Sequence, residues 1–568
     1  MKKSFKTYFQ SEKELLDESL QDFSTHHPEM GRALGLEASS ERDPHIERLL
    51  EGCSYLAARV RQQIDLGLNH TYDDVVRRIA PNFVRPTPSM TMIEFYSPHH
   101  QLSETEHLGE GILLASEAVG QEQCACTFQT TDQIAVQPIS IRRIKMFHTD
   151  EEPLIRIDFE INDGVDLSKL RLGHLPIFIN ASYKLALKWH YLLLREVSGI
   201  DVRTYRSNSE PEQITHLNPS HIQFKTWNTG IIKGDSLQRS PLTFIKHTTS
   251  FPELAFFISI DLSEKTFQTY LFSIDIHLKK ETEVLKPQPD LFKINVVPAI
   301  NLFEMSAEPI ITKPNKTEYT LHVQNDKTQS FTIYSLNHIQ GIQRKNSERF
   351  DLEDYDQQSY SSLYKHTYRL KQEHTNELVL KNKIILSPQL KDESVLSSLV
   401  QCTNGHYPHT QLSKMMLKVK DRSVSTQLRA TNIVKPSPYR ESHHNPAKSS
   451  HYLSLINMDI FKLSEKKNLV ELLSMLDHSG KLSSGTQAIE SSAIEERHII
   501  KRGVFTNVLL FDLNMTLHGP FDLFEAHHFG NLLFPFLKSF TPVNVTFELQ
   551  INLNTDKLKL SWASDDAK

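Results

Sequence analysis

The chain has 568 residues and a formal net charge of −6, so its charge balance indicates neither a nucleic-acid nor a membrane-surface partner. Its four cysteines show no CxxC spacing, which argues against a disulfide framework and a zinc ribbon. No apolar run reaches about 18 residues and the N-terminus has no apolar signal segment, so we expect a soluble cytosolic protein without direct membrane insertion.

The N-terminal segment is predicted to be helical. Apolar side chains in residues 5–25 recur at the spacing of one helix face, and Pro28 ends this helix because the residue before a proline avoids the α region. A short turn is expected at 29–36. A longer helix is expected at 43–64, with Asp43 as its N-cap, and a further amphipathic piece at 72–79 precedes a proline-rich exit.

The helix at 43–64 carries an apolar seam with steps of three and four residues. Charged and polar residues between the seam positions, such as Glu51 and Arg61, are expected to form a solvated face. Such a seam packs either within its own domain or against helices of another chain, and we favour the intermolecular interpretation. The predicted interface residues are Ile46, Leu49, Leu50, Cys53, Leu56, Ala57, Val60 and Ile64.

After Ser89 the apolar period changes from about 3.5 to 2, which predicts strands. The clearest alternations lie at 155–161, 270–278, 509–517 and 543–553, and a helix is expected near 180–196. We therefore predict an α+β fold with a long-helix module followed by mainly antiparallel, β-rich domains. The expected domains are a helical module at 1–88, a β-rich domain at 89–285, an α+β domain with polar insertions at 286–450 and a β-rich domain at 451–568.

No motif in the chain predicts catalysis. The sequence lacks HExxH, the phosphate-binding GxxxxGK[ST] loop, GxGxxG and the GxSxG elbow. Four pairs of adjacent histidines occur, at 26–27, 99–100, 443–444 and 527–528, but adjacent residues point in different directions on a helix or a strand. We predict no catalytic residues, no metal ligands and no cofactor.

Three blocks resemble one known family. DPHIERLLEGCSYLAARVRQQID, followed by IAPNFVRPTPSM, is similar to the N-terminal signature of the TssF (ImpG/VasA) family of type VI secretion baseplate proteins. INVVPAINLFEMSAEPI at 294–310 resembles a second family block, in which Val296 stands where the family usually has cysteine. A weaker likeness, expected to be β-structured, runs from KRGVFTNVLLFDL to HHFGNLLFPFLKSFTPVNVTFEL.

The resemblance implies a structural role in the wedge of a contractile-injector baseplate. The partners it implies are TssG, a second TssF copy, TssE, TssK and the VgrG spike, with the wedge nucleating the contractile sheath. It implies a cytoplasmic location, docked on the inner-membrane secretion complex through other subunits. Two alternatives remain open: a wedge protein of a phage-derived contractile tail, and a cytosolic metal-dependent enzyme that uses the histidine pairs.

Overall fold

The computed structural model describes residues 5–563, apart from 34–43, 81–83, 121–122, 149–152, 206–210, 226–240, 264, 281–284, 325–330, 356–365, 375–379, 388–389, 391, 442–448, 478, 502–503, 520, 543–544 and 555–557. The chain divides into two compact units. Unit 1 comprises Met1–Val84 and His443–Asn457, and unit 2 comprises Arg85–Ser442 and Met458–Lys568.

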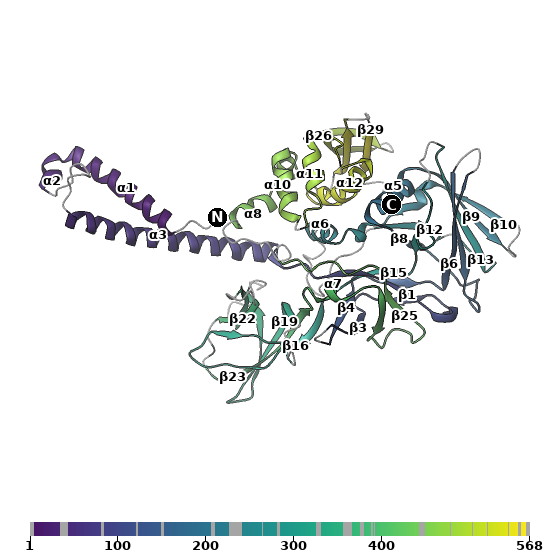
Figure 1. Ribbon diagram of the computed structural model, residues 1–568, viewed down its shortest axis with the longest axis horizontal. Coiled ribbons are helices and arrows are strands. Elements are labelled where there is room, and N and C mark those ends of the chain that lie inside the picture. The colour runs from purple at the N-terminus through teal and green to yellow at the C-terminus, as the bar shows by residue number, and fades with distance from the viewer. Residues whose placement is uncertain are drawn as a thin grey trace. The chain divides into compact units, whose positions relative to one another are not determined.

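Unit 1 is helical (Figure 1). Its helices are α1 (Phe5–His26), α2 (Pro28–Ala33), α3 (Pro44–Ile79) and α8 (Ser449–Ile456). Helices α1 and α3 lie side by side as a hairpin, and α8, from a distant part of the sequence, lies against α3 (Figure 1). The predicted helix at 5–25 is confirmed.

Helix α3 is longer than predicted. The expectation of two separate pieces, at 43–64 and 72–79, was wrong, because one uninterrupted helix runs from Pro44 to Ile79. The apolar spacing lapses between the two pieces, and Gly67 lies there. A glycine inside a helix costs only about 1 kcal/mol relative to alanine, which is too little to end a helix of this length.

Unit 2 contains a six-stranded closed barrel with the order β1-β15-β4-β3-β24-β25. Its strands are β1 (Met90–Tyr96), β3 (Leu113–Val119), β4 (Cys124–Thr130), β15 (Val296–Ile300), β24 (Met415–Val419) and β25 (Arg429–Asn432). Strand β15 is buried at every position, which explains its continuous apolar sequence. The barrel joins segments that the predicted limits at 89–285 and 286–450 assign to different domains, and those limits stay a prediction.

Two further sheets are formed by strands within residues 139–293 of unit 2. One has the order β10-β9-β13-β7-β6, with β6 (Ile139–His148), β7 (Pro153–Ile161), β9 (Val197–Tyr205), β10 (Pro211–Leu217) and β13 (Leu271–Leu278). The other has the order β11-β12-β8-β14, with β8 (His174–Ile179), β11 (Ile222–Phe224), β12 (Phe257–Asp261) and β14 (Phe292–Lys293). The predicted strands at 155–161 and 270–278 are thus present as β7 and β13.

An eight-stranded sheet has a hydrophobic core of its own. Its strands are β16 (Phe303–Ser306), β17 (Ile310–Ile311), β18 (Glu318–Thr320), β19 (Thr332–Gln343), β20 (Arg349–Asp354), β21 (Thr367–His374), β22 (Leu380–Ser387) and β23 (Ser394–Thr403). A small pair is formed by β2 (Glu106–Leu108) and β5 (Ile134–Val136).

The C-terminal sheet has the order β26-β27-β28-β29. Its strands are β26 (Ile489–Lys501), β27 (Val504–Met515), β28 (Thr546–Leu553) and β29 (Leu558–Ala563). Strands β27 and β28 pair in parallel and β20 pairs with β21 in parallel, whereas the other pairs among the described strands are antiparallel. The α+β prediction is confirmed.

The remaining helical segments of unit 2 surround these sheets. They are α5 (Tyr183–Arg195), α6 (Pro241–Ser250), α7 (Tyr407–Gln411), α9 (Ile460–Leu463), α10 (Lys466–Leu476), α11 (Ser483–Ala488), α12 (Leu523–Lys538) and the 3-10 turns η1 (Pro98–His100), η2 (Pro219–His221) and η4 (Pro252–Ala255). Helix α5 contacts β8, β11 and β12, and α12 contacts α5 and β28.

Helix α12 corrects the expectation of a β-structured block at HHFGNLLFPFLKSF. Asp522 caps the helix, accepting hydrogen bonds from the backbone nitrogens of Phe524 and Glu525 at 3.0 and 2.9 Å. The helix is buried around most of its circumference, so its sequence is apolar without a helical period. It provides the connection between the parallel strands β27 and β28, which requires a crossover of this kind.

Candidate partner-binding surface

Helix α3 presents one narrow face to α1. The small side chains of Ser54 and Ala58 are 1% and 0% exposed. Their size allows close packing between the helices, although most of the surrounding contacts are polar. Tyr8 Oη donates a hydrogen bond to Asp65 at 2.9 Å, and this bond raises the pKa of Tyr8.

Two ion pairs lie beside this contact. Lys13 Nζ is 2.8 Å from Glu51 Oε1, and Arg61 pairs with Glu12. The prediction of a solvated face at Glu51 and Arg61 was therefore incomplete, because both side chains bind α1 while remaining partly exposed. Exposed ion pairs contribute about 0–1 kcal/mol each, so they fix the orientation of α1 more than they stabilise it.

The predicted interface residues form a second face of α3, which we call the α3 stripe. At 100° per residue this stripe lies roughly a third of a turn from the face that binds α1. It consists of Leu49, Leu50, Cys53, Leu56, Ala57, Val60 and Ile64, with Ile46 at the same angular position but its side chain outside the described residues.

The α3 stripe is open to solvent in this chain. Leu49 is 70% exposed, Leu56 64%, Val60 60% and Ile64 57%. Cys53 and Ala57 are also exposed, and Leu50 is half-buried. Fully burying such an aliphatic side chain stabilises a protein by about 1.5–3 kcal/mol, so a continuous exposed row of them favours association.

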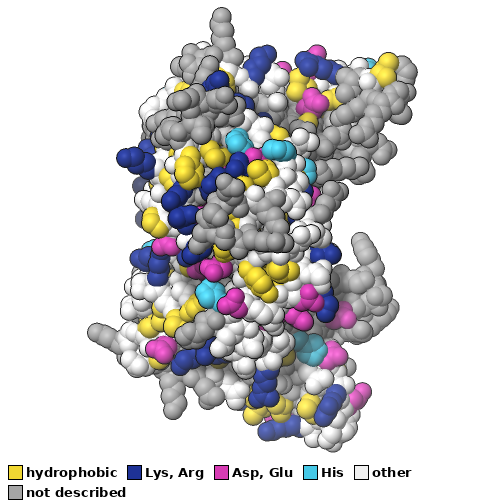
Figure 2. Space-filling model, turned by 90° about the vertical axis from the view of Figure 1, so that its right-hand side faces the viewer, with side chains coloured by type: hydrophobic (Ala, Val, Ile, Leu, Met, Phe, Trp, Pro, Cys, Tyr) yellow, Lys and Arg dark blue, Asp and Glu magenta, His cyan; other side chains and the backbone are white. Residues whose placement is uncertain are grey.

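One other face of the molecule differs from this stripe (Figure 2). On the face drawn in Figure 2, hydrophobic side chains occur in small groups, with basic, acidic and histidine side chains interspersed. Mixed charges of this kind are typical of a solvated surface. A helical stripe with four large exposed aliphatic side chains is the stronger candidate for a partner.

Two exposed apolar residues on α1 were not among the predicted interface residues. Leu15 and Phe23 are both exposed, although the apolar spacing of residues 5–25 includes them. None of the side chains of α1 is buried in this chain. The hairpin therefore has unburied apolar positions on both of its long helices, and the spacing in α1 was the signal that could have extended the predicted site.

The described histidines do not form a metal site. Among the residues that the structure describes, no three His, Cys, Asp or Glu side chains are placed to hold a metal ion. In the pair on α12, His527 stacks on Trp562 at 5.9 Å while His528 meets the edge of Tyr183 at 6.3 Å. The two rings therefore diverge, as expected for adjacent residues of a helix. The pair at 443–444 lies outside the described residues.

The buried cysteines have a structural environment. Cys124 and Cys126 lie on β4 of the barrel, both buried, and burial raises the pKa of the Cys126 thiol to about 12. A thiol with a raised pKa is a poor nucleophile because little thiolate forms at neutral pH. Both residues are therefore small members of the barrel core, and the Cys126 thiol is poorly suited to redox chemistry.

The whole sequence matches one protein family. Residues 1–565 fit the profile of the family described as "Type VI secretion system, TssF". The chain belongs to the TssF family. A curated relative, the type VI secretion system component TssF1 of Pseudomonas aeruginosa, is 24% identical over 211 residues, which is 34% of this chain and 34% of the relative. That match spans about a third of the relative's length.

Solved structures share the fold of this TssF-family chain. A chain of a type VI secretion TssK–TssF–TssG baseplate subcomplex, determined by cryo-electron microscopy, superposes with a TM-score of 0.76 and 18% identity, over 91% of this chain and 98% of that chain. A chain of the baseplate complex from the type VI secretion system gives a TM-score of 0.57 and 17% identity, over 98% of each chain.

The family blocks correspond to defined parts of this TssF-family structure. The first block lies on α3 and leads to β1, and the block at 294–310 contains β15, β16 and Asn301. None of the described helices combines the length and the apolar character that a membrane crossing requires.

Proposed function

We propose that this TssF-family chain is a non-enzymatic structural subunit of the type VI secretion baseplate wedge. Family membership over residues 1–565 carries the proposal. The similar solved structures are baseplate assemblies, one of which contains TssK and TssG, and these two proteins are the proposed direct partners. No observation favours the phage-tail alternative, since the matched family is one of a secretion system.

The α3 stripe is the proposed site of wedge assembly. Its exposed aliphatic row would be buried in a helical bundle with TssG and a second copy of this chain. Contacts with TssE and the VgrG spike, and docking at the inner-membrane complex through other subunits, complete the proposed assembly. Obligate interfaces of this kind are large and apolar, so the isolated chain is expected to be less soluble than the assembled wedge.

The stripe is tested by placing a charge in its centre. Leu56→Asp and Val60→Asp should abolish co-purification with TssG, since burying an unpaired carboxylate costs several kcal/mol. Both positions are exposed in the chain alone, so helical content should not change. The measurement is pull-down of co-expressed TssG, with circular dichroism of the purified variant.

The matched control is Arg59→Asp, which places a new carboxylate at an exposed position of α3 about a third of a turn from the centre of the stripe. This variant should retain TssG at the wild-type level. Wild-type recovery of TssG by both stripe variants would contradict the proposed interface.

A further inference from the structure

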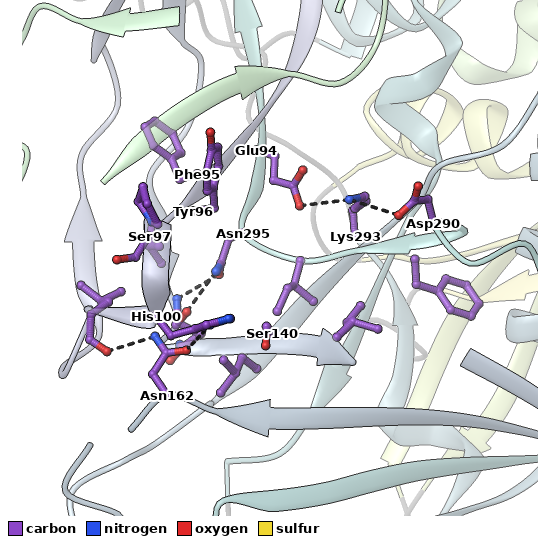
Figure 3. Close-up of a pocket in the computed structure, with 18 of the residues that line it drawn as sticks. Glu94, Phe95, Tyr96, Ser97, His100, Ser140, Asn162, Asp290, Lys293 and Asn295 are labelled. Carbon is purple, nitrogen blue, oxygen red and sulfur yellow. Dashed lines mark hydrogen bonds and ion pairs between the residues drawn. The ribbon is translucent and has the colours of Figure 1, made fainter. Parts of the chain in front are cut away.

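A pocket of about 370 Å³ lies in unit 2, where the end of β1 meets β14 and the start of β6 (Figure 3). Its volume is within the range of small-ligand sites, about 300–1,000 Å³. Glu94, Ser97 and Lys293 are among its lining residues, and apolar walls are supplied by Ile139, Ile141 and Ile294. The proposed wedge interface on α3 does not use it.

The frame of the pocket is held by buried amides. Asn295 accepts from Gln137 N at 2.9 Å and donates to Gln137 O at 3.0 Å. Asn162 donates to Leu102 O at 3.1 Å and lies 3.1 Å from His100 Nδ1. Asn295 and His100 both have φ of 56°, a left-handed backbone conformation that is uncommon outside glycine, although asparagine and histidine adopt it more readily than other residues. Strained residues of this kind cluster at binding sites.

One end of the pocket has more negative than positive side chains. Lys293 Nζ lies 3.5 Å from Glu94 Oε1 and 3.6 Å from Asp290 Oδ1, so one ammonium group serves two carboxylates (Figure 3). Both distances exceed the 2.7–2.9 Å typical of a charge-assisted hydrogen bond. Burial raises the pKa of Glu94, while Lys293 and the more distant Lys414 act in the opposite direction.

The other end of the pocket offers hydrogen-bonding groups. Among the described residues, Ser97 Oγ is buried and has no hydrogen-bond partner. Ser97 lines the pocket together with His100 and Asn162 (Figure 3). Leaving a buried hydroxyl without a hydrogen-bond partner is unfavourable, and a ligand atom would relieve that cost.

We propose that this pocket binds an arginine or lysine side chain of a partner protein. The cationic head would lie at Glu94 and Asp290, the aliphatic stem would pack on the isoleucine walls, and a polar group of the partner would reach Ser97. Charge complementarity selects a cation over an anion, because the lining carries two carboxylates and one ammonium group. A protein segment fits better than a lone ion, because the pocket combines a charged end, an apolar middle and a polar end.

The test uses the full-length chain with labelled isoleucine methyl groups. The probes are N-acetyl-arginine methylamide, N-acetyl-lysine methylamide and the neutral isostere N-acetyl-citrulline methylamide. The methyl signals of Ile139, Ile141 and Ile294 should shift on titration with either cationic probe. Citrulline should bind roughly tenfold more weakly than arginine, the usual effect of losing one charged interaction.

Three variants assign the effect to the charged end. Glu94→Gln should weaken binding of the arginine probe by roughly tenfold. Lys293→Met should strengthen it, because the competing ammonium group is removed. Glu117→Gln is the matched control: Glu117 also lies on a barrel strand and 3.5 Å from a lysine, Lys418, but it is outside the pocket, and the variant should bind as the wild type does. Unshifted signals of isoleucines outside the pocket verify that each variant folds.

Several results would overturn the proposal. These are equal affinity for arginine and citrulline probes, no shift with either cationic probe, wild-type affinity in Glu94→Gln, and tighter binding of N-acetyl-glutamate methylamide. Tighter binding of spermidine than of the arginine probe would assign the pocket to a free polyamine instead. None of these measurements needs TssG, so failure here and failure of the wedge proposal are distinguishable.

Discussion

At the scale of single residues, Asn301 connects the barrel to the eight-stranded sheet. Its Nδ2 donates to Thr127 O at 2.8 Å and to Asn404 Oδ1 at 2.7 Å. Its Oδ1 accepts from Thr403 Oγ1 at 2.8 Å and from Asn404 N at 2.7 Å. Asn301 is fully buried, so every polar atom of this side chain is satisfied inside the protein. A packing role of this kind explains why an asparagine lies inside an apolar block.

Replacing Asn301 with alanine should lower the free energy of unfolding by about 3 kcal/mol or more, because several buried groups lose their partners. Denaturant unfolding of the full chain measures the effect. Asn337→Ala is the control, since Asn337 is exposed and donates a single hydrogen bond to Glu304 at 3.1 Å, and it should cost less than about 1 kcal/mol. Equal losses in the two variants would contradict the role of the network.

At the scale of elements, α12 and β29 meet at a glycine. A Cβ built on Gly530 would lie 2.1 Å from a ring carbon of Trp562, whose Nε1 donates to Asn531 Oδ1 at 2.7 Å. The tryptophan ring therefore covers α12 at the one position without a side chain. The sequence of α12 alone does not predict this contact with Trp562, because glycine is normally unfavourable in a helix.

Gly530→Ala should destabilise the chain by about 1–3 kcal/mol, although alanine is the better helix former, because the ring must move or the helix must shift. The free energy of unfolding reports the loss, and a change in tryptophan fluorescence, to which Trp562 contributes with the two other tryptophans of the chain, accompanies the displaced ring. Gly52→Ala on α3 is the opposite case, since a Cβ there meets nothing within 4 Å, and it should be neutral or stabilise the helix by up to about 1 kcal/mol. A stabilising Gly530→Ala would show that the ring is not held in place.

The sequence predicted elements well where one face was buried. Strand β7 alternates apolar and polar residues because only one of its faces is fully buried. Helix α12 was missed because burial on nearly all sides removes the period. The spacing of apolar residues predicted the α3 stripe. It did not predict that α1 packs on a different face of α3, since the sequence does not say which of two neighbouring faces an adjacent helix covers. The pocket at Glu94 was not predicted, because its lining comes from four separated segments.

At the scale of the whole molecule, buried histidines set the response to acid. Burial lowers the pKa of His190 to about 3, of His247 to about 3 and of His528 to about 4. In the unfolded chain these groups titrate near 6.5. As the pH falls, these histidines are therefore protonated in the unfolded state before they are protonated in the folded state. Their contribution to the free energy of unfolding is constant above about pH 6.5 and decreases below that pH.

Each of these histidines should contribute a loss of up to about 1.4 kcal/mol per pH unit between about pH 6 and pH 4. Denaturant midpoints measured across this interval give the total slope. His190→Gln should reduce that slope by the share of one group while the carboxylates titrate as before. An unchanged slope in this variant would show that His190 takes up its proton in the folded state.

The barrel has a consequence for the biosynthesis of the chain. Strand β1 pairs on one side with β25, as in the pair Ile93 and Asn432, and on the other with β15. A ribosome releases residues 90–96 long before residues 429–432 exist. During most of translation, strand β1 therefore has an unpaired backbone edge and uncovered apolar side chains. Chaperones bind segments of this kind, and such segments aggregate when chaperones are scarce. Yield of the intact protein should accordingly depend on how late the last barrel strand emerges, and slow translation before residue 429 is expected to lower it.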